Sequence, residues 1–181
     1  FFRRAVDPKE VLRVDDYAAK LGVDYAPSPA GTRYRPVDGV SVVYAGLAAD
    51  SATWIDAAAA NGKALLFSVL PPERRTAANR RTNIAQLQNA PRFRGAATIL
   101  VAELDVAGSN VSAAYLTGNL VLDTTWRDVP PHVLVTNAFA ARLLGRSLEG
   151  AAPGTAGRTL RGSLRVKVSP LDYAARNVVV R

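Results

Sequence analysis

Few residues in this chain have side chains suited to acid–base or metal chemistry, and they are widely separated. The single histidine, His132, stands between Pro130-Pro131 and the apolar run Val133-Leu134-Val135. One imidazole supplies only one of the three or four protein ligands that a zinc site needs, and there is no cysteine to supply the others. We therefore interpret His132 as a structural residue at the start of a strand, with a hydrogen-bonded ring, rather than as a catalytic base.

The candidate carboxylates are Asp15-Asp16, the pair Glu103 and Asp105, and Asp123. A two-carboxylate mechanism requires both groups to be fixed across one cleft, and no spacing here predicts such a cleft. In an extended segment Glu103 and Asp105 would share one face and could hold a cation weakly, but the pattern favours a solvated strand end. Neither a nucleophile elbow nor a phosphate-binding glycine loop occurs. We predict no catalytic, metal-binding or cofactor-binding residue in this chain.

The strongest charge cluster consists of six arginines that only Glu73 balances. They are Arg74, Arg75, Arg80, Arg81, Arg92 and Arg94. Such a set, with a net charge of +8, could recognise phosphate groups. Apart from Phe93, no aromatic residue is interleaved with these arginines for base stacking, so the cluster is more typical of a solvated loop and helix face. A stand-alone basic module for polyanions is the alternative function. The glycosylation pattern Asn110-Val111-Ser112 is common by chance.

The composition is that of a folded domain, with 49% hydrophobic and 21% charged residues among 181. No apolar run approaches the roughly 18 residues of a membrane-spanning helix, so we predict no membrane span. The chain begins at Phe1 without an initiator methionine, and we expect a piece of a longer protein. Breakers between Asp24 and Gly39 predict an N-terminal extension and linker over residues 1–39, with the compact domain over residues 40–181.

These residues must be positioned by short secondary-structure elements, and the sequence predicts that most of these elements are strands. Apolar or alternating runs predict strands at 40–45, 63–70, 96–102, 120–122, 132–136, 160–168 and 177–180. Helical spacing predicts short helices within 1–21 (ending at Gly22), at 53–60, around 84–93, and from an Asn137 cap to a stop at Gly145. The fold class expected is therefore α+β and strand-rich, as a sandwich or open barrel with two or three peripheral short helices.

Several segments in this order resemble the protease-associated domain of zinc aminopeptidases and carboxypeptidases of metallopeptidase family 28. They are the approach from Asp24-Tyr25-Ala26-Pro27 to Val42-Val43-Tyr44-Ala45-Gly46, the turn Asn61-Gly62-Lys63 before Ala64-Leu65-Leu66, the pair Gly95-Ala96 before a strand, Pro131-His132-Val133-Leu134-Val135 with the helix ending at Leu144-Gly145, and Asn177-Val178-Val179. The likeness covers about residues 21 to 181. The alanine-rich stretch from Asp50 to Ala60 departs from the family's acid-and-glycine pattern before the Gly-Lys turn.

The resemblance implies that residues 40–181 form a non-catalytic protease-associated domain. In that family a separate catalytic domain binds two zinc ions through a His-x-Asp motif and further Asp, Glu and His ligands, and none of these ligand positions exists in this chain. It therefore implies no cofactor in this chain, the parent's peptidase domain as partner, peptide or protein substrate as a further contact, and no specific nucleic acid. It also implies a secreted or periplasmic bacterial protein.

Overall fold

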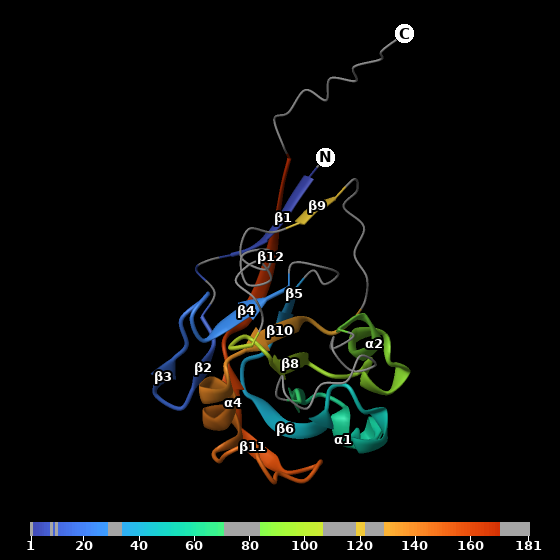
Figure 1. The fold of residues 1–181 in the computed structure, drawn as a ribbon. Coiled ribbons are helices and arrows are strands. Elements are labelled where there is room, and N and C mark those ends of the chain that lie inside the picture. The colour runs from blue at the N-terminus through green and yellow to red at the C-terminus, as the bar shows by residue number, and fades with distance from the viewer. Residues whose placement is uncertain are drawn as a thin grey trace.

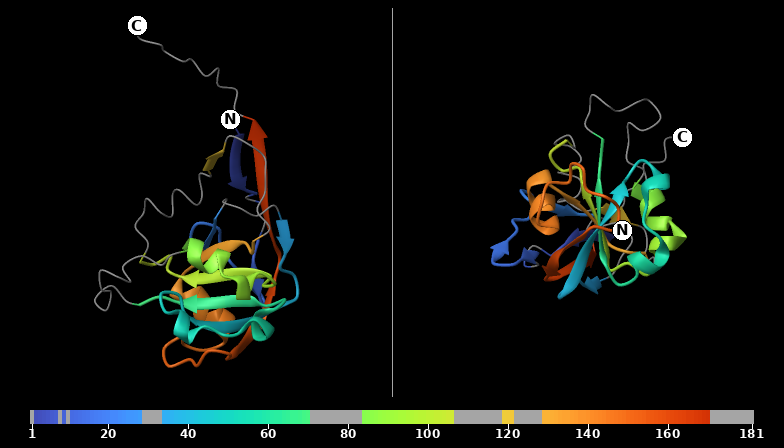
Figure 2. Two further views of the ribbon diagram at one scale, coloured as in Figure 1. Left: turned by 90° about the vertical axis from the view of Figure 1, so that its right-hand side faces the viewer. Right: turned by 90° about the horizontal axis from the view of Figure 1, so that it is seen from below.

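Two β-sheets and a few short helices make up the molecule (Figure 1). The computed structural model describes residues 2–7, 9, 11–28, 34–70, 84–106, 119–121 and 129–170. The larger sheet has eight strands and curls into a half-barrel, and the smaller sheet has four. Figure 2 shows the smaller sheet standing away from the larger one, with the helices packed on both faces of the larger sheet.

The eight-stranded sheet has four parallel strands at its centre and antiparallel strands at both sides. In spatial order its strands are β3 (Tyr17–Ala18), β2 (Arg13–Val14), β11 (Ala156–Arg161), β6 (Val40–Leu47), β7 (Ala64–Ser68), β8 (Thr98–Ala102), β10 (His132–Val135) and β4 (Tyr25–Pro27). The parallel strands are β6, β7, β8 and β10. Parallel neighbours need crossover connections, which is why helices lie between several of these strands.

The central strands are buried on both faces, which explains their uninterrupted apolar sequences. Side chains alternate between the two faces of a strand, so consecutive residues enter different cores. Leu66 and Leu100 lie in one hydrophobic cluster, whereas their neighbours Leu65 and Ile99 lie in the other. All four side chains are fully buried. The sheet is therefore the middle layer of three.

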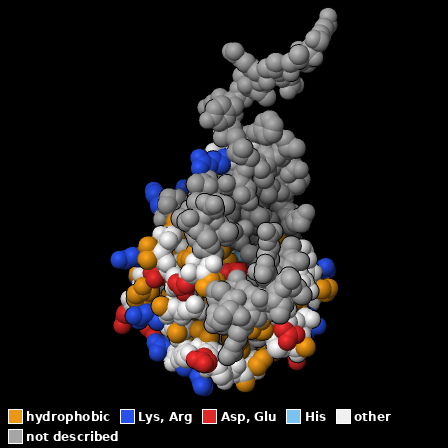
Figure 3. Space-filling view, in the orientation of Figure 1, with side chains coloured by type: hydrophobic (Ala, Val, Ile, Leu, Met, Phe, Trp, Pro, Cys, Tyr) orange, Lys and Arg blue, Asp and Glu red, His pale blue; other side chains and the backbone are white. Residues whose placement is uncertain are grey.

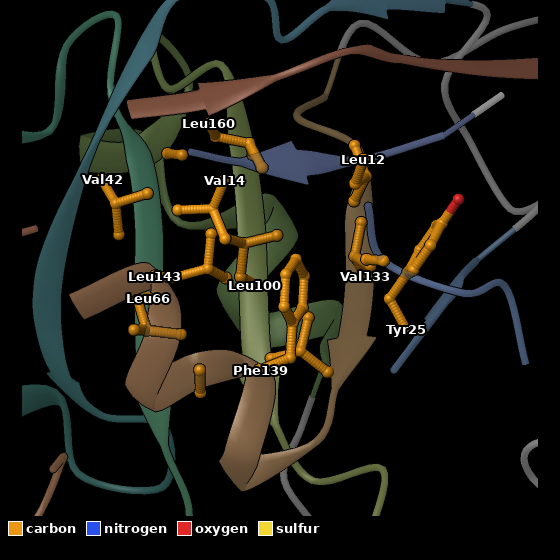
Figure 4. Close-up of a cluster of buried hydrophobic side chains, with 14 of the residues drawn as sticks. Leu12, Val14, Tyr25, Val42, Leu66, Leu100, Val133, Phe139, Leu143 and Leu160 are labelled. Atoms are coloured by element: carbon orange, nitrogen blue, oxygen red, sulfur yellow. The ribbon is translucent and has the colours of Figure 1, made fainter. Parts of the chain in front are cut away.

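Helix α4 (Asn137–Leu144) covers one face of the sheet. Its residues Phe139 and Leu143 pack against the cluster drawn in Figure 4, where they point toward the strands. The side chain of Thr136 accepts a hydrogen bond from the Phe139 backbone N–H at 3.1 Å, so Thr136 is the N-cap. The prediction that Asn137 caps this helix was wrong by one residue, because either side chain suits a cap. The predicted stop at Gly145 is confirmed.

On the opposite face, the described residues include four short helical segments. They are the 3-10 helix η1 (Ser51–Thr53), α1 (Ala57–Ala60), α2 (Ile84–Asn89) and the 3-10 helix η3 (Pro91–Phe93). Of these, α1, α2 and η3 contribute buried residues to the second cluster. Trp54, Phe67 and Phe93 form an aromatic group here, with ring centroids 5.3 to 6.1 Å apart. Asp56 caps α1 by accepting from the Ala59 backbone N–H, so the helix predicted at 53–60 begins only at Ala57, and η1 before it is a separate 3-10 turn that shares only Thr53 with the prediction.

The four-stranded sheet joins the two ends of the described chain. In spatial order it contains β5 (Tyr34–Pro36), β12 (Ser163–Pro170), β1 (Phe2–Val6) and β9 (Asn119–Val121). Its register places Phe2 opposite Pro170. Beyond β1, the Asp7 carboxylate accepts a charged hydrogen bond from Lys167 at 2.7 Å, and this bond is the main reason that the pKa of Asp7 is lowered. The single strand predicted at 160–168 is two strands with Gly162 between them.

The predicted fold class is confirmed, since the protein is a strand-rich α+β domain with a curled sheet and short peripheral helices. The helix predicted within residues 1–21 was wrong. These residues form β1, β2 and β3, and Asp15 in the turn between β2 and β3 has a left-handed φ of 50°. The helical spacing failed because β11 and β12 satisfy the backbone groups of this segment. The strand predicted at 177–180 lies outside the described residues.

The division of the chain at residue 39 stays a prediction. Strands on its N-terminal side pair with strands on its C-terminal side in both sheets, as β1 pairs with β12 and β2 pairs with β11. Among the described residues, no helix has the length and apolar character needed to cross a membrane.

Candidate functional site

His132 is the first residue of β10 and lies beside Ile99 of β8. Its side chain is completely buried, and burial lowers the pKa of the imidazole to about 3. The ring is therefore neutral at physiological pH, because an imidazolium would have to form without solvation. A group in this position belongs to the packed sheet and has no direct route to a substrate in solvent.

The structure does not bring the predicted carboxylates together. Glu103 and Asp105 lie in a turn after β8 rather than in an extended segment, so the shared face that we expected for them is absent. The Asp105 carboxylate instead accepts a hydrogen bond from the Asn137 backbone N–H at the start of α4. Within the described ranges, no three His, Cys, Asp or Glu residues are grouped closely enough to hold a metal ion. Asp123 and the Asn110-Val111-Ser112 pattern lie outside the described residues.

Only part of the arginine cluster can be placed. Arg92 and Arg94 are exposed at η3, whereas Arg74, Arg75, Arg80 and Arg81 lie outside the described residues. The Arg92 guanidinium carbon lies 5.7 Å from the centre of the Trp54 ring, within range of a cation–π contact. One of the two described arginines is therefore engaged with an aromatic residue that the sequence pattern did not connect to it.

Two of the family-like segments contact each other at the start of β7 and β8. The Gly62 backbone N–H donates to the Gly95 carbonyl oxygen at 2.9 Å, and the Ala97 N–H donates to the Lys63 carbonyl at 2.9 Å. A Cβ atom at Gly95 would lie 2.4 Å from Asn61 Oδ1, closer than atoms can pack. The Gly-Lys turn and the Gly-Ala pair thus form one junction, and a side chain at position 95 would displace the Asn61 side chain from its present position.

A third segment places its glycine at an irregularity of β6. The register between β6 and β7 shifts between Tyr44 and Gly46, where Gly46 has a left-handed φ of 114°. A Cβ atom at Gly46 would lie 2.5 Å from the Thr53 carbonyl oxygen, so the chain of η1 packs directly on this glycine. Leu47 donates its N–H to Thr53 Oγ1 at 2.9 Å. The Tyr-Ala-Gly ending of the strand is therefore explained by backbone geometry.

Charged side chains line two adjoining depressions beside the β2–β3 turn. One has a volume of about 530 Å³ and is lined by Asp15, Asp16, Arg158, Thr159 and Arg161. The other has a volume of about 250 Å³ and is lined by Val14, Asp15, Asp16, Tyr17, Arg142 and Arg158. Asp15 and Arg158 form an ion pair between the β2–β3 turn and β11. Figure 3 shows basic and acidic side chains interspersed along the left flank, where β2, β3 and α4 lie in Figure 1.

The hairpin that carries these acids is fixed to α4 through Tyr17. The Arg142 guanidinium carbon lies 4.4 Å from the centre of the Tyr17 ring. The Tyr17 hydroxyl donates to Asp24 Oδ2 at 2.9 Å, and this hydrogen bond is the main cause that raises the pKa of Tyr17. Sequence reasoning missed this surface. Asp15 and Arg158, which meet at this surface, are 143 positions apart, and no local motif connects them.

The fold and this surface define a strand-rich α+β domain with a charged groove at one side of its larger sheet. No protein-family model matches the chain, and no curated protein matches it. Among solved structures, the chain is similar to an aminopeptidase from Aneurinibacillus sp. strain AM-1, with 16% sequence identity and a TM-score of 0.37. The similarity covers 93% of this chain and 35% of that enzyme, so the chain spans about a third of its length. Identity and TM-score at these levels assign no activity.

Proposed function

We propose that this chain is a non-catalytic protease-associated domain of a zinc-dependent exopeptidase. In this proposal it shapes substrate access or contacts partners, while a peptidase domain of the same parent chain binds zinc and cleaves the substrate. The parent would be a bacterial protein that is secreted or periplasmic. The chain itself would hold no cofactor and would contribute no catalytic or metal-ligating residue.

The observation that carries the proposal is the junction between the Gly-Lys turn and the Gly-Ala pair. In the sequence these two segments are separate and individually common. In the structure they are joined by two backbone hydrogen bonds at the entrance to adjacent parallel strands, β7 and β8. Gly95 and Gly46 each make a close backbone or side-chain approach that a Cβ atom would block. The small residues on which the resemblance rests therefore have structural roles in this chain, which supports the proposal.

The order of the remaining segments supports the same proposal. Pro131 precedes β10, β10 is followed directly by α4, and Gly145 ends that helix in a left-handed conformation with a φ of 77°. The strand, the helix and the glycine stop thus follow one another in the order that the resemblance implies. The Asn177-Val178-Val179 segment lies outside the described residues and adds no support.

Two experiments test the proposal. The gene sequence on both sides of this segment should encode a peptidase domain with a downstream His-x-Asp motif. The 181-residue chain, assayed alone with aminoacyl and peptidyl p-nitroanilides, should show no turnover with or without added zinc. Turnover that zinc restores after chelation, and that His132→Gln abolishes while circular dichroism shows an intact fold, would mean that the chain is itself a metalloenzyme.

A further inference from the structure

The charged depression between the β2–β3 turn and β11 contains both paired and unpaired ionic groups. Asp15 and Arg158 neutralise each other as an ion pair across it. The side chains of Arg13, Asp16 and Arg161 are exposed and form no ion pair or hydrogen bond with any residue that the structure describes. Asp16 and Arg161 line the depression itself, and Arg13 lies next to Arg161 on the neighbouring strand.

The sheet register places the two free arginines opposite each other. Arg161 of β11 pairs with Arg13 of β2, and the adjacent pair is Leu160 with Val14. Leu160 and Val14 are buried in the core on the α4 side, so alternation directs Arg13 and Arg161 to the other face. Directly opposed residues have Cβ atoms about 5 Å apart, and like charges in this position repel each other. A carboxylate bound by both guanidinium groups would remove the repulsion and accept their planar donors.

Two residues of β11, Thr159 and Arg161, line the depression together with Asp16. A strand rises about 3.3 Å per residue, so the side chains of Arg161 and Thr159 are separated by about 7 Å along β11. A dipeptide in extended conformation spans about 7 Å as well. The volume of about 530 Å³ lies in the range of small-ligand sites.

We propose that this depression binds a short peptide with both termini free. Arg161 binds its C-terminal carboxylate with help from Arg13, its register partner on β2, and Asp16 binds its N-terminal ammonium group. The choice of a peptide rests on the proposed function, since peptides with free ends are substrates and products of an exopeptidase. The site would hold such a peptide outside the catalytic domain, on the accessory domain itself.

Binding of three peptides to the ¹⁵N-labelled chain, measured by NMR titration near physiological salt, tests this site. They are alanyl-alanine, its N-acetyl derivative and its C-terminal amide. Alanyl-alanine should bind saturably, and each blocked peptide should bind about fivefold more weakly, which is the value of one exposed ion pair. The peptide should shift the amide signals of residues 13–16 and 158–161. Absence of saturable binding, or shifts confined to other segments, would overturn the inference.

Single substitutions separate the two ends of the site. Arg161→Gln should remove the difference between alanyl-alanine and its amide, and Asp16→Asn should remove the difference between alanyl-alanine and its N-acetyl derivative. Arg146→Gln, an exposed arginine just after α4 and outside the depression, is the matched control and should change neither. Equal binding of the free and N-acetylated dipeptides would show a simple anion site and refute the proposal. Such a failure leaves the accessory-domain proposal standing, because a flanking His-x-Asp motif tests that separately.

Discussion

The buried imidazole of His132 predicts a specific loss of stability in acid. The folded protein binds a proton at His132 only near pH 3, whereas the unfolded chain binds it with an ordinary pKa of 6.5. Below pH 6.5 the unfolded state therefore holds more protons than the folded state, and lowering the pH favours unfolding. Each pH unit between these values costs about 1.4 kcal/mol, so the free energy of unfolding should fall by about 2 to 3 kcal/mol between pH 7 and pH 4.5.

A comparison with His132→Gln isolates this contribution. Other groups, including Asp7 with its lowered pKa, titrate in both proteins, and their effects cancel in the difference between the two pH profiles. We would measure urea unfolding of both proteins at several values between pH 7 and pH 4.5. The variant should be less stable at pH 7 but should lose less stability in acid. Parallel pH profiles would refute the reasoning, because they would mean that the folded protein protonates His132 as readily as the unfolded chain does.

Three further predictions concern the core, the motif junction and the arginine cluster. Leu100→Ala should lower the free energy of unfolding by about 2 to 5 kcal/mol, and a loss near zero would show that Leu100 does not belong to the core. Gly95→Ala should lower the free energy of unfolding by about 1 to 3 kcal/mol, because the added methyl group overpacks the junction. The same substitution should lower it clearly less in a protein that already carries Asn61→Ala, and an equal loss in both proteins would exclude the predicted clash. A labelled oligonucleotide should bind weakly or not at all near 0.15 M salt, where screening is strong. Submicromolar binding that Arg80→Ala and Arg81→Ala weaken would favour the polyanion-binding alternative.

The central strands were predictable because their sequences carry the information locally. A strand buried on both faces needs an apolar residue at nearly every position, and the segments at 64–68 and 98–102 meet this condition. The helix α4 was predictable for a similar reason, since its apolar spacing and its Gly145 stop lie within one short segment. In both cases the requirement of the fold coincides with a pattern that neighbouring residues display.

The N-terminal segment shows where such reasoning failed. Apolar residues between Val11 and Leu21 have helical spacing, but Leu12 and Val14 are buried while Arg13 between them is exposed, as in a strand. Two short strands provide too few residues to reveal this alternation in the sequence. Strand β2 finds its backbone partners on β11, which lies more than 140 residues later in the chain, and β3 pairs with β2. Local spacing therefore could not decide between the two conformations.

The sequence by itself determined the layered, strand-rich α+β class, because buried strands need runs of apolar residues and helix ends favour glycine. Both requirements are met within short segments of the chain. It also restricted the chemistry, since it contains one histidine and no cysteine. Only the tertiary structure decided that Gly62 and Gly95 form one junction and that Arg13 lies opposite Arg161. Those pairs depend on strand register and on contacts between distant segments. Charges such as Asp16 and Arg161 are exposed wherever they lie, so their grouping into one depression leaves no pattern in the sequence.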